Sequence, residues 1–330
     1  MIKIGVLGVG YLGKIHVQLL KKIPGFELVG FYDPNMERRL EAESMFEIPA
    51  FDSEDELIEA CDALDIVTST DAHFSCAVKA IRKSKHLFIE KPVSYSIDEA
   101  HELLKLSREA NIKVQIGHVE RFNPAFTAAL PHIIRPIYIE SHRMGPILDR
   151  HLDIPVVLDL MIHDIDWILS VVKSPLRKVT SNGVAVFNDT PDVVNARLDF
   201  SNGTIANLTV SRIATEKKRS AEIFQPQSNL SIDFLNKKAS IYESEEVLEL
   251  SGTQHESAPI GLPGDLRPKP ILKALAIQGN NAIYDELTGF HHAIVTDSKP
   301  PVDIEDGFAA LDIAWLILKR MNFNGMRSLY

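Results

Sequence analysis

Apolar and polar positions in the first third of the chain alternate between two periods. Compact runs rich in β-branched and aromatic residues are each followed by a segment with apolar residues at helical spacing. The predicted strands are Ile2 to Leu7, Glu27 to Tyr32, Leu64 to Ser69, His86 to Ile89 and Ile112 to Ile116. The predicted helices are Lys14 to Lys22, Met36 to Phe46, Asp55 to Ala60, Ser75 to Lys83, and one from the capping box Ser96-Ile97-Asp98-Glu99 to about Ala110. This alternation predicts an α/β fold with a mostly parallel, doubly wound sheet.

The rhythm changes near residues 118–124, after which strands follow one another without helices between them. A strand over Ile137 to His142 and a long helix over Val156 to Val172 open this second half. The strands after them are Lys178 to Phe187, Val193 to Phe200, Thr204 to Ile213 and Glu222 to Ile232. Ser201-Asn202-Gly203 and Asn236-Lys237-Lys238 have the composition of hairpin turns. We therefore predict an α+β domain with an open, mainly antiparallel sheet and helices on one face.

The end of the chain returns to helical spacing. Residues 251–270, rich in Gly, Pro and Ser, predict a loop, and two closing helices follow at Ala282 to Thr296 and Ile304 to Asn322. The predicted domains are residues 1–120 and 121–330, and the last helix is a candidate to pack back on the first domain. A length of 330 residues with 45% hydrophobic content suits two packed domains of ordinary size.

Charge and cysteine content exclude several function classes. The net charge of -10 and pI near 5.7 argue against attraction to nucleic acid or to anionic membranes. Cys61 and Cys76 are too few for a disulfide framework and lack the spacing of a metal site, so we expect no metal and a reducing cytoplasm. The chain has no run of about 18 apolar residues and no secretory segment at its N-terminus, so a soluble protein is expected.

Gly8, Gly10 and Gly13 follow the first predicted strand and open a helix, the context expected of a dinucleotide-binding turn. The first glycine permits a tight turn, the second admits the pyrophosphate, and the third lets helix and strand pack closely. Asp33 ends the second strand and is placed to accept hydrogen bonds from the ribose hydroxyls of NAD. Its carboxylate would repel the 2′-phosphate of NADP, although Arg38 and Arg39 leave NADP open. The other candidate cofactor ligands are Tyr11, Leu12, Thr70, His73, Glu90 and Lys91.

Lys91, in Glu90-Lys91-Pro92, directly follows a predicted parallel strand. A lysine after a strand is more often surface charge, but in a doubly wound sheet ligands bind beyond the carboxyl ends of the strands. Lys91 is therefore expected beside the nicotinamide, where a second positive charge would depress its pKa and let it exchange protons near neutral pH. The bond before Pro92 is a candidate cis bond that would fix the direction of the lysine.

Asp159 and His163 stand four residues apart in the long helix that begins the second half. That spacing puts both on one helix face, where a carboxylate orients an imidazole or raises its basicity. The alternative is structural, with Asp159 and Asp164 as acids near a helix N-terminus and His163 as an interior residue.

The three motifs Gly8-x-Gly10-x-x-Gly13, Glu90-Lys91-Pro92 and Asp159-x-x-x-His163, in this order, resemble those of the glucose-fructose oxidoreductase and inositol dehydrogenase family, Gfo/Idh/MocA. The resemblance spans nearly the whole chain. It implies an NAD-binding Rossmann domain at 1–120 and a substrate-binding and oligomerisation domain at 121–330. It also implies that Lys91 and His163 handle the proton and that Asp159 is a substrate or histidine partner.

Residues 117–124 and 157–166 are similar to a branch of that family that oxidises the 3-hydroxyl of UDP-N-acetylglucosamine. The substrate is accordingly expected to be a sugar or nucleotide sugar. The candidate substrate ligands are Lys91, His118, Arg121, Asn123, Arg143, Asp159 and His163. Arg121, Arg143, Arg212 and the run Lys217-Lys218-Arg219 are candidates to meet a diphosphate, although such runs are usually solvated.

The sequence also fits other functions. The chain also fits an inositol or simple-sugar dehydrogenase, an NAD(P)H-dependent reductase of sugars or of a tetrapyrrole, or a regulator that binds nucleotide without turnover. A homodimer or homotetramer is expected because an open sheet covered on one side leaves another face. That face is predicted to carry Val184, Val186, Ala206, Leu208 and Val210.

Overall fold

The computed structural model describes residues 1–146, 154–244, 270–279 and 281–324. The chain divides into two compact units, Met1–Val119 with Asn281–Asp312, and Glu120–Asn280 with Ile313–Tyr330. The segment 281–312 belongs to the first unit. The predicted domains, 1–120 and 121–330 with their separate roles, stay a proposal. In the described part of the chain, no helix combines the length and apolar character needed to cross a bilayer.

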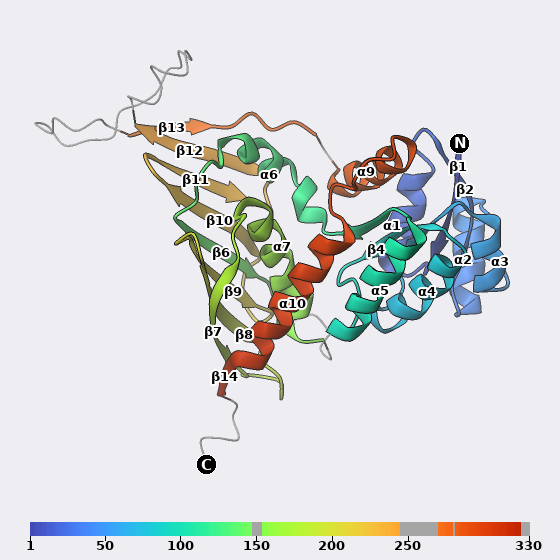
Figure 1. The fold of residues 1–330 in the computed structure, drawn as a ribbon, viewed down its shortest axis with the longest axis horizontal. Coiled ribbons are helices and arrows are strands. Elements are labelled where there is room, and N and C mark those ends of the chain that lie inside the picture. The colour runs from blue at the N-terminus through green and yellow to red at the C-terminus, as the bar shows by residue number, and fades with distance from the viewer. Residues whose placement is uncertain (147–153, 245–269, 280, 325–330) are drawn as a thin grey trace, which may run out of the picture. The chain divides into compact units, whose positions relative to one another are not determined.

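The first unit is built on a five-stranded parallel sheet in the order β2-β1-β3-β4-β5 (Figure 1). Its strands are β1 (Ile2–Leu7), β2 (Phe26–Tyr32), β3 (Ala63–Ile66), β4 (His86–Glu90) and β5 (Val114–Gly117). Its helices are α1 (Tyr11–Leu20), α2 (Met36–Phe46), α3 (Glu54–Ala60), α4 (Thr70–Arg82), α5 (Ile97–Ala110), α9 (Ala282–Val295) and the first part of α10 (Ile304–Arg320). The predicted doubly wound sheet is confirmed, and Ser96 and Glu99 form the predicted capping box.

Several boundaries in the first unit differ from prediction, and the largest difference is at the start of α4. Strand β3 ends at Ile66 and not at Ser69, because its pairing with β1 and β4 stops there. Helix α4 consequently begins at Thr70, five residues before the predicted Ser75. Thr68, which suits a strand by propensity, and Ser69 form the connection between the two elements.

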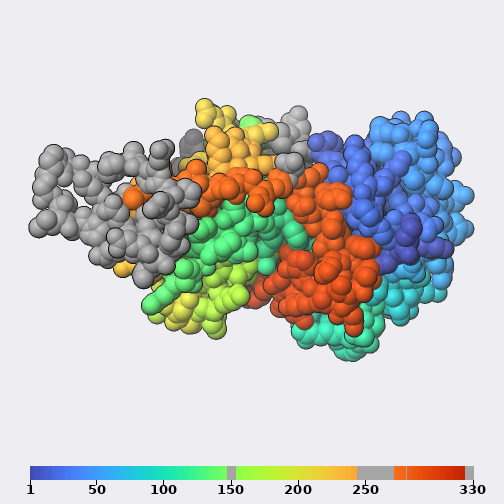
Figure 2. Space-filling view, turned by 90° about the horizontal axis from the view of Figure 1, so that it is seen from above, coloured from blue at the N-terminus to red at the C-terminus, as the bar shows by residue number. Residues whose placement is uncertain are grey.

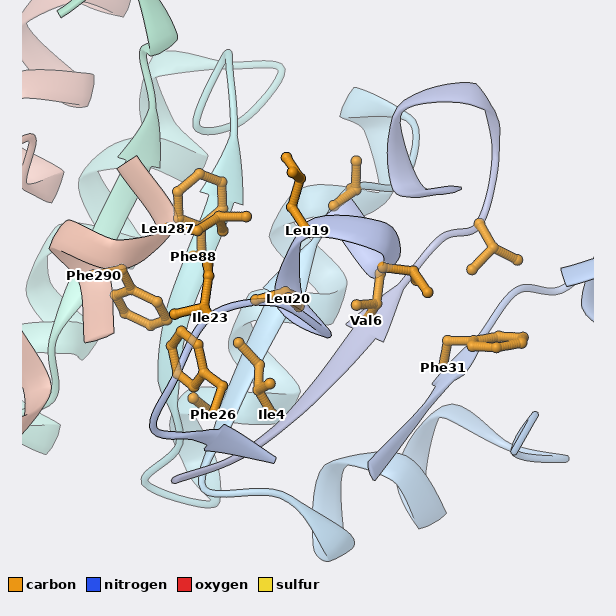
Figure 3. Close-up of a cluster of buried hydrophobic side chains, with 14 of the residues drawn as sticks. Ile4, Val6, Leu19, Leu20, Ile23, Phe26, Phe31, Phe88, Leu287 and Phe290 are labelled. Atoms are coloured by element: carbon orange, nitrogen blue, oxygen red, sulfur yellow. The ribbon is translucent and has the colours of Figure 1, made fainter. Parts of the chain in front are cut away.

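The core of the first unit includes residues from the far end of the chain (Figure 3). Phe290 on α9 lies with its ring centroid 6.2 Å from that of Phe26 and 6.0 Å from that of Phe88. Leu287, one turn earlier on α9, is also fully buried in this cluster. Helix α9 therefore completes a core that the strands and α1 begin. Strands covered on both faces in this way read as near-continuous apolar runs, which is why they were recognisable in the sequence.

The second unit contains a nine-stranded sheet in the order β13-β12-β11-β10-β6-β9-β8-β7-β14. Its strands are β6 (Tyr138–Met144), β7 (Leu176–Val184), β8 (Val193–Phe200), β9 (Ile205–Ser211), β10 (Lys218–Gln225), β11 (Ser228–Asp233), β12 (Lys238–Ser244), β13 (Pro270–Ala274) and β14 (Met321–Asn324). Its helical segments are η1 (Val119–Phe122), α6 (Pro124–Ala129), η2 (Leu130–His132), the π-helical η3 (Val157–Met161), α7 (Ile162–Val171) and the end of α10. Pairing is antiparallel except for β6 with β9 and β14 with β7, so the predicted open, mainly antiparallel sheet is confirmed.

Several elements of the second unit were predicted wrongly. The single strand predicted over Glu222 to Ile232 is a hairpin of β10 and β11, broken at Pro226, which has no N–H to donate, and at Gln227 with φ of 63°. The closing helix ends at Arg320, and β14 follows it. Strands β12 and β13 were not predicted. Of the predicted loop 251–270, only Pro270 lies within the described residues, and it begins β13.

The long helix predicted over Val156 to Val172 starts with a π-helical segment, η3, and becomes α-helical at Ile162. Figure 1 shows α6 and α7 against one face of the sheet. Figure 2 shows orange residues of β13 and the segment after it beside the green segment that contains α6.

The face of this sheet that lies away from α7 is polar. Ala206, Leu208 and Val210 are fully buried on the helix side, whereas Val184 is 46% and Val186 38% exposed. The prediction that all five share an uncovered apolar face is therefore wrong. Side chains alternate between the faces at every residue, so a strand's apolar set lies on one face only, and β7 presents Val184 on the other. Asn207 donates to the Tyr138 hydroxyl at 2.7 Å on this second face.

Candidate functional site

The three glycines after β1 have separate steric roles. A Cβ on Gly8, whose φ is 92°, would lie 2.7 Å from the Val67 carbonyl oxygen, and a Cβ on Gly13 would lie 1.9 Å from the Gly8 carbonyl oxygen. A Cβ on Gly10 would meet nothing within 4 Å. Gly8 and Gly13 thus allow the close packing, and Gly10 presents bare backbone to open space at the start of α1. A helix N-terminus with no acidic residue in its first turn suits an anion, so these residues fit the pyrophosphate of a dinucleotide.

Asp33 ties the end of β2 to this glycine turn. It is 3% exposed, and its Oδ2 accepts from the Val9 N–H at 3.0 Å while Oδ1 accepts from the Asn35 N–H at 2.9 Å. Arg39 donates to the carbonyl oxygens of Phe51 and Asp52 at 2.9 and 3.1 Å. Arg39 is therefore held by the main chain, and Arg38, which is exposed, is the arginine left to meet a phosphate near β2. Contact between Asp33 and a ribose stays a prediction.

The remaining predicted cofactor ligands differ in accessibility. Tyr11 is exposed and Leu12 and Thr70 are half-buried. His73 is buried on α4, with Nδ1 2.9 Å from the Pro92 carbonyl oxygen and Nε2 3.2 Å from the Thr68 carbonyl oxygen. Burial lowers the pKa of His73, and the two carbonyl contacts oppose that change only in part. His73 therefore anchors the main chain beyond Lys91.

Lys91 lies half-buried directly after β4, at the carboxyl end of the parallel sheet. Its backbone N–H donates to Oε2 of Glu90 at 3.1 Å, and the Lys91–Pro92 peptide bond is cis. Gly117 leaves space for the Glu90 carboxylate, because a Cβ there would lie 2.7 Å from Oε1. Lys91 therefore lies at the carboxyl end of β4, where it was predicted.

Two arginines predicted to contact substrate are bound to acids of α7. Arg143 on β6 is 3% exposed; its Nε donates to Asp164 Oδ2 at 3.0 Å, its Nη2 to Asp164 Oδ1 at 2.9 Å, and its Nη1 to Glu120 Oε1 at 2.8 Å. Arg121 makes a fork with Asp166 through two hydrogen bonds of 2.8 Å. This geometry favours a positioning role for Arg121 and Arg143 over direct contact with a diphosphate.

Asn123 and His118, two further predicted substrate ligands, are buried. Asn123 caps α6 by accepting from the Ala125 N–H, and its amide donates to Glu120 Oε2 at 2.9 Å and to the Phe234 carbonyl oxygen at 3.0 Å. His118 is buried just after β5. Their direct contact with substrate stays a prediction.

Asp159 and His163 are the accessible pair of their helical segment. Asp164 and Asp166 are buried and bound by arginine, whereas Asp159, in η3, and His163, in α7, are half-buried. The π-helical start was not anticipated, and such bulges often occur at functional sites. Lys91 belongs to the first unit and His163 to the second, so their joint action stays a prediction.

Arg219 lies directly opposite Arg143 on the antiparallel neighbour β10. Its side chain is 49% exposed, and its Nη1 is 3.8 Å from the Glu120 oxygen that Arg143 already holds. Burial and the nearby Arg143 charge lower the pKa of Arg219, while Glu120, Asp164 and Asp159 oppose the change. An exposed guanidinium that is only weakly bound to acid is suited to receive an anionic ligand.

Sequence reasoning missed a buried set in the first unit, His16, Asp65 and its contact with Glu90. One signal was present. Asp65 interrupts the otherwise apolar strand Ala63–Ile66, and a buried acid needs a partner. Among the described residues, no group of three His, Cys, Asp or Glu side chains is placed to hold a metal ion.

Comparison with known proteins gives a consistent result over both units. Residues 2–118 match the family model of the oxidoreductase family with an NAD-binding Rossmann fold, and residues 115–230 match the GFO/IDH/MocA C-terminal domain. The first of these matches confirms NAD as the cofactor. The chain is 38% identical over 239 residues to UDP-N-acetylglucosamine 3-dehydrogenase of Acidithiobacillus ferrooxidans, covering 72% of this chain and 76% of that protein.

A solved structure of that Acidithiobacillus ferrooxidans enzyme superposes with a TM-score of 0.88 and 32% identity, covering 97% of each chain. The scyllo-inositol 2-dehydrogenase (NAD(+)) of Bacillus subtilis is 28% identical over 234 residues, covering 64% of this chain and 67% of that protein. The glycine turn, the lysine after β4 and the half-buried Asp159 and His163 thus occur in a chain that matches the family in both units. The chain belongs to the GFO/IDH/MocA family of NAD-binding oxidoreductases.

Proposed function

We propose that this protein is an NAD-dependent dehydrogenase that oxidises the 3-hydroxyl of the sugar ring in UDP-N-acetylglucosamine. The observation that carries the proposal is the 97% coverage, at a TM-score of 0.88, between this chain and a UDP-N-acetylglucosamine 3-dehydrogenase. Such coverage includes both units, so the substrate-binding part is compared as well as the cofactor-binding part. Retention of Lys91, Asp159 and His163 favours an enzyme over a regulator that binds nucleotide without turnover.

The proton chemistry is assigned to three side chains. NAD, when bound, would supply the hydride acceptor, which is C4 of its nicotinamide. His163, assisted by Lys91, removes the proton of the hydroxyl, and Asp159 orients the imidazole or the sugar. A neutral imidazole can accept the hydroxyl proton at its unprotonated ring nitrogen, which is the chemistry assigned to His163.

Arg219 is proposed as the residue that meets the diphosphate of the substrate. Support comes from its 49% exposure and its 3.8 Å separation from Glu120, compared with the short ion pairs of Arg121 and Arg143. Guanidinium groups recognise phosphate oxygens through paired donors. The substrate would then be held by Arg219 at its diphosphate end and by Asp159 and His163 at its sugar.

Replacing Arg219 with alanine is expected to raise the KM for UDP-N-acetylglucosamine about 10- to 100-fold with a smaller change in kcat, since a hydrogen bond to a charged group contributes about 1.5–3 kcal/mol. Steady-state kinetics measure both constants. Lys218→Ala is the matched control, because Lys218 is the preceding residue and points to the opposite face of β10. A KM for Arg219→Ala equal to that of the control would contradict the assignment.

The function itself is tested by following NADH formation with four substrates, UDP-N-acetylglucosamine, UDP-glucose, myo-inositol and glucose. We expect turnover with UDP-N-acetylglucosamine, and with NAD in preference to NADP. Turnover with myo-inositol alone would favour the inositol dehydrogenase alternative, which the 28% identity to the Bacillus subtilis enzyme supports. Tight NAD binding with no turnover of any of the four would count against the dehydrogenase assignment.

We further propose a cytoplasmic homodimer or homotetramer. The two cysteines, Cys61 and Cys76, are buried and free, which suits a reducing compartment. The contact between copies is assigned to the polar face of the nine-stranded sheet, where Val184 and Val186 are exposed among hydrogen-bonding side chains. A light-scattering mass equal to that of one chain at micromolar concentration would exclude this assembly.

A further inference from the structure

A chain of buried charged side chains lies behind Lys91 in the first unit. His16 on α1 places Nδ1 2.9 Å from Asp65 Oδ2 on β3 and Nε2 3.4 Å from Glu90 Oε1 on β4. His16 and Asp65 are fully buried, and Glu90 nearly so. The second oxygen of Glu90 accepts from the Lys91 N–H at 3.1 Å. Four residues on three elements of the sheet and its first helix are thus connected in series.

The electrostatics of this chain favour a charged histidine between two carboxylates. Burial alone would lower the pKa of His16, but Asp65 and Glu90 outweigh burial and raise that pKa well above the ordinary 6.5. Burial would likewise raise the pKa of Glu90, but His16 and Lys91 lower it. Burial raises the pKa of Asp65, and His16 opposes the rise. The uncharged Phe88 ring also packs edge-on against the His16 ring, with 5.7 Å between the ring centroids.

Buried charges without partners are strongly destabilising, and removing one member of a buried pair leaves the other uncompensated. The carboxylates of Asp65 and Glu90 lie on opposite ring nitrogens of the same imidazole. The second oxygen of Glu90, Oε2, ends this series and accepts from the main chain of Lys91, the residue expected to handle protons. His73 holds the same loop from the other side through the Pro92 carbonyl oxygen at 2.9 Å.

We propose that Asp65, His16 and Glu90 act as a positioning chain for Lys91, in which the imidazolium of His16 keeps the Glu90 carboxylate ionised against the Lys91 main chain. This inference rests on the proposed role of Lys91 in proton handling. His16, Asp65 and Glu90 are positioning residues, since they act through Lys91. The fixed main chain directs the Lys91 side chain, and a misplacement of about 1 Å in a reacting group costs about 10²-fold in rate.

The first test is kinetic and uses His16→Gln, which keeps a hydrogen-bonding side chain but not a positive charge. We expect kcat to fall about 10- to 100-fold while the Kd for NAD changes less than about threefold. Without the imidazolium, buried Glu90 should protonate at a higher pH, because burial raises its pKa and the opposing charge is gone. The pH profile of kcat in His16→Gln should therefore gain a second acid limb, in addition to the one that protonation of His163 gives the unmodified enzyme.

A double variant assigns that limb. In His16→Gln with Glu90→Gln the limb should vanish, and the loss in kcat should be smaller than the product of the two single losses, because both changes break one series. Gln18→Ala is the matched control, since Gln18 is exposed on the same helix α1 and should leave kcat and its pH profile unchanged. Full turnover in His16→Gln, with no new limb, overturns the proposal.

The second test needs no turnover. The ¹⁵N shifts of the His16 ring, assigned by their loss in His16→Gln, should report a ring that loses its proton at a pH above the ordinary 6.5, and Glu90→Gln should lower that pH. A His16 ring that loses its proton at or below 6.5 overturns the proposal. If the unmodified protein turned over none of the sugars, the proposed function would fail, and these spectra would still decide whether the charged chain exists.

Stability gives a third readout with a defined sign. A histidine whose pKa is raised by folding stabilises the native state fully below its unfolded value, about 6.5, and this contribution is lost as pH rises through the folded value. The Tm of the unmodified protein should therefore fall on the alkaline side by more than that of His16→Gln. Equal alkaline slopes for the two proteins count against a charged His16.

Discussion

Turnover by Lys91→Ala and by His163→Ala is expected to fall about 10²- to 10⁴-fold, with NAD binding nearly unchanged. The reason is that each variant removes a group assigned to proton transfer, while the glycine turn and Asp33 that are expected to hold the cofactor are left in place. Single-turnover kinetics and NAD titration measure the two quantities separately. Lys105→Ala, at an exposed position of α5, is the control for loss of a lysine from the same unit.

The pH profile of kcat then distinguishes the base from its assistant. If His163 takes the proton, the loss of kcat on the acid side that its protonation causes is present in Lys91→Ala and absent in His163→Ala. The reverse pattern would make Lys91 the base. Full turnover in both variants would refute the assignment of the pair.

The largest expected change in stability comes from Arg143→Met, which should lower the free energy of unfolding of the second unit by about 3–5 kcal/mol. This variant leaves the carboxylates of Asp164 and Glu120 buried without the guanidinium that binds both. Burial would lower the pKa of Arg143, but Asp164 and Glu120 outweigh burial and raise that pKa. Both acids therefore stabilise the charge of Arg143. Urea unfolding followed by tryptophan fluorescence reports this unit, because the two tryptophans, Trp167 and Trp315, both belong to it.

Arg197→Met is the matched control for Arg143→Met. Arg197 lies on the same sheet and pairs with Asp199 at 3.1 Å, but it is 43% exposed, and exposed ion pairs contribute about 0–1 kcal/mol. Combining Arg143→Met with Asp164→Asn and Glu120→Gln should restore part of the loss, since the buried charges then disappear together. A loss for Arg143→Met no larger than for Arg197→Met would mean that the cluster is not held by charge.

The first unit was largely predictable because its strands are buried on both faces and its helices are amphipathic, so both periods show in the sequence. Met36–Phe46 and the capping box at Ser96 were predicted to the residue. The second unit was less predictable. Pro226 and Gln227 break an apparently continuous strand, and β14 depends on pairing with β7, a partner far away in sequence.

The site was predictable where a motif marks it and not where charges pair over long distances. Lys91 stands at the end of β4 as expected. Arg143 and Arg121 were assigned to substrate because the sequence shows a positive charge but not the distant acid that neutralises it. Asp164 is 21 positions from Arg143, and Asp166 is 45 positions from Arg121. Arg219 belongs to a run expected to be solvated, but strand pairing places it directly opposite Arg143. The sequence does not show this pairing either, because the two residues are far apart along the chain.

Phe290 and Leu287 of α9 complete the core around Phe26 and Phe88, and Gln115 on β5 donates to the Glu286 carbonyl oxygen at 2.7 Å. A growing polypeptide therefore cannot close this core until α9, far along the chain from Phe26 and Phe88, has left the ribosome. Until then the nascent first unit keeps aromatic side chains uncovered, which is the state that chaperones bind and that aggregates most readily. The order of synthesis thus makes the cofactor-binding unit, whose strands emerge before α9, dependent on that later helix for its final shape.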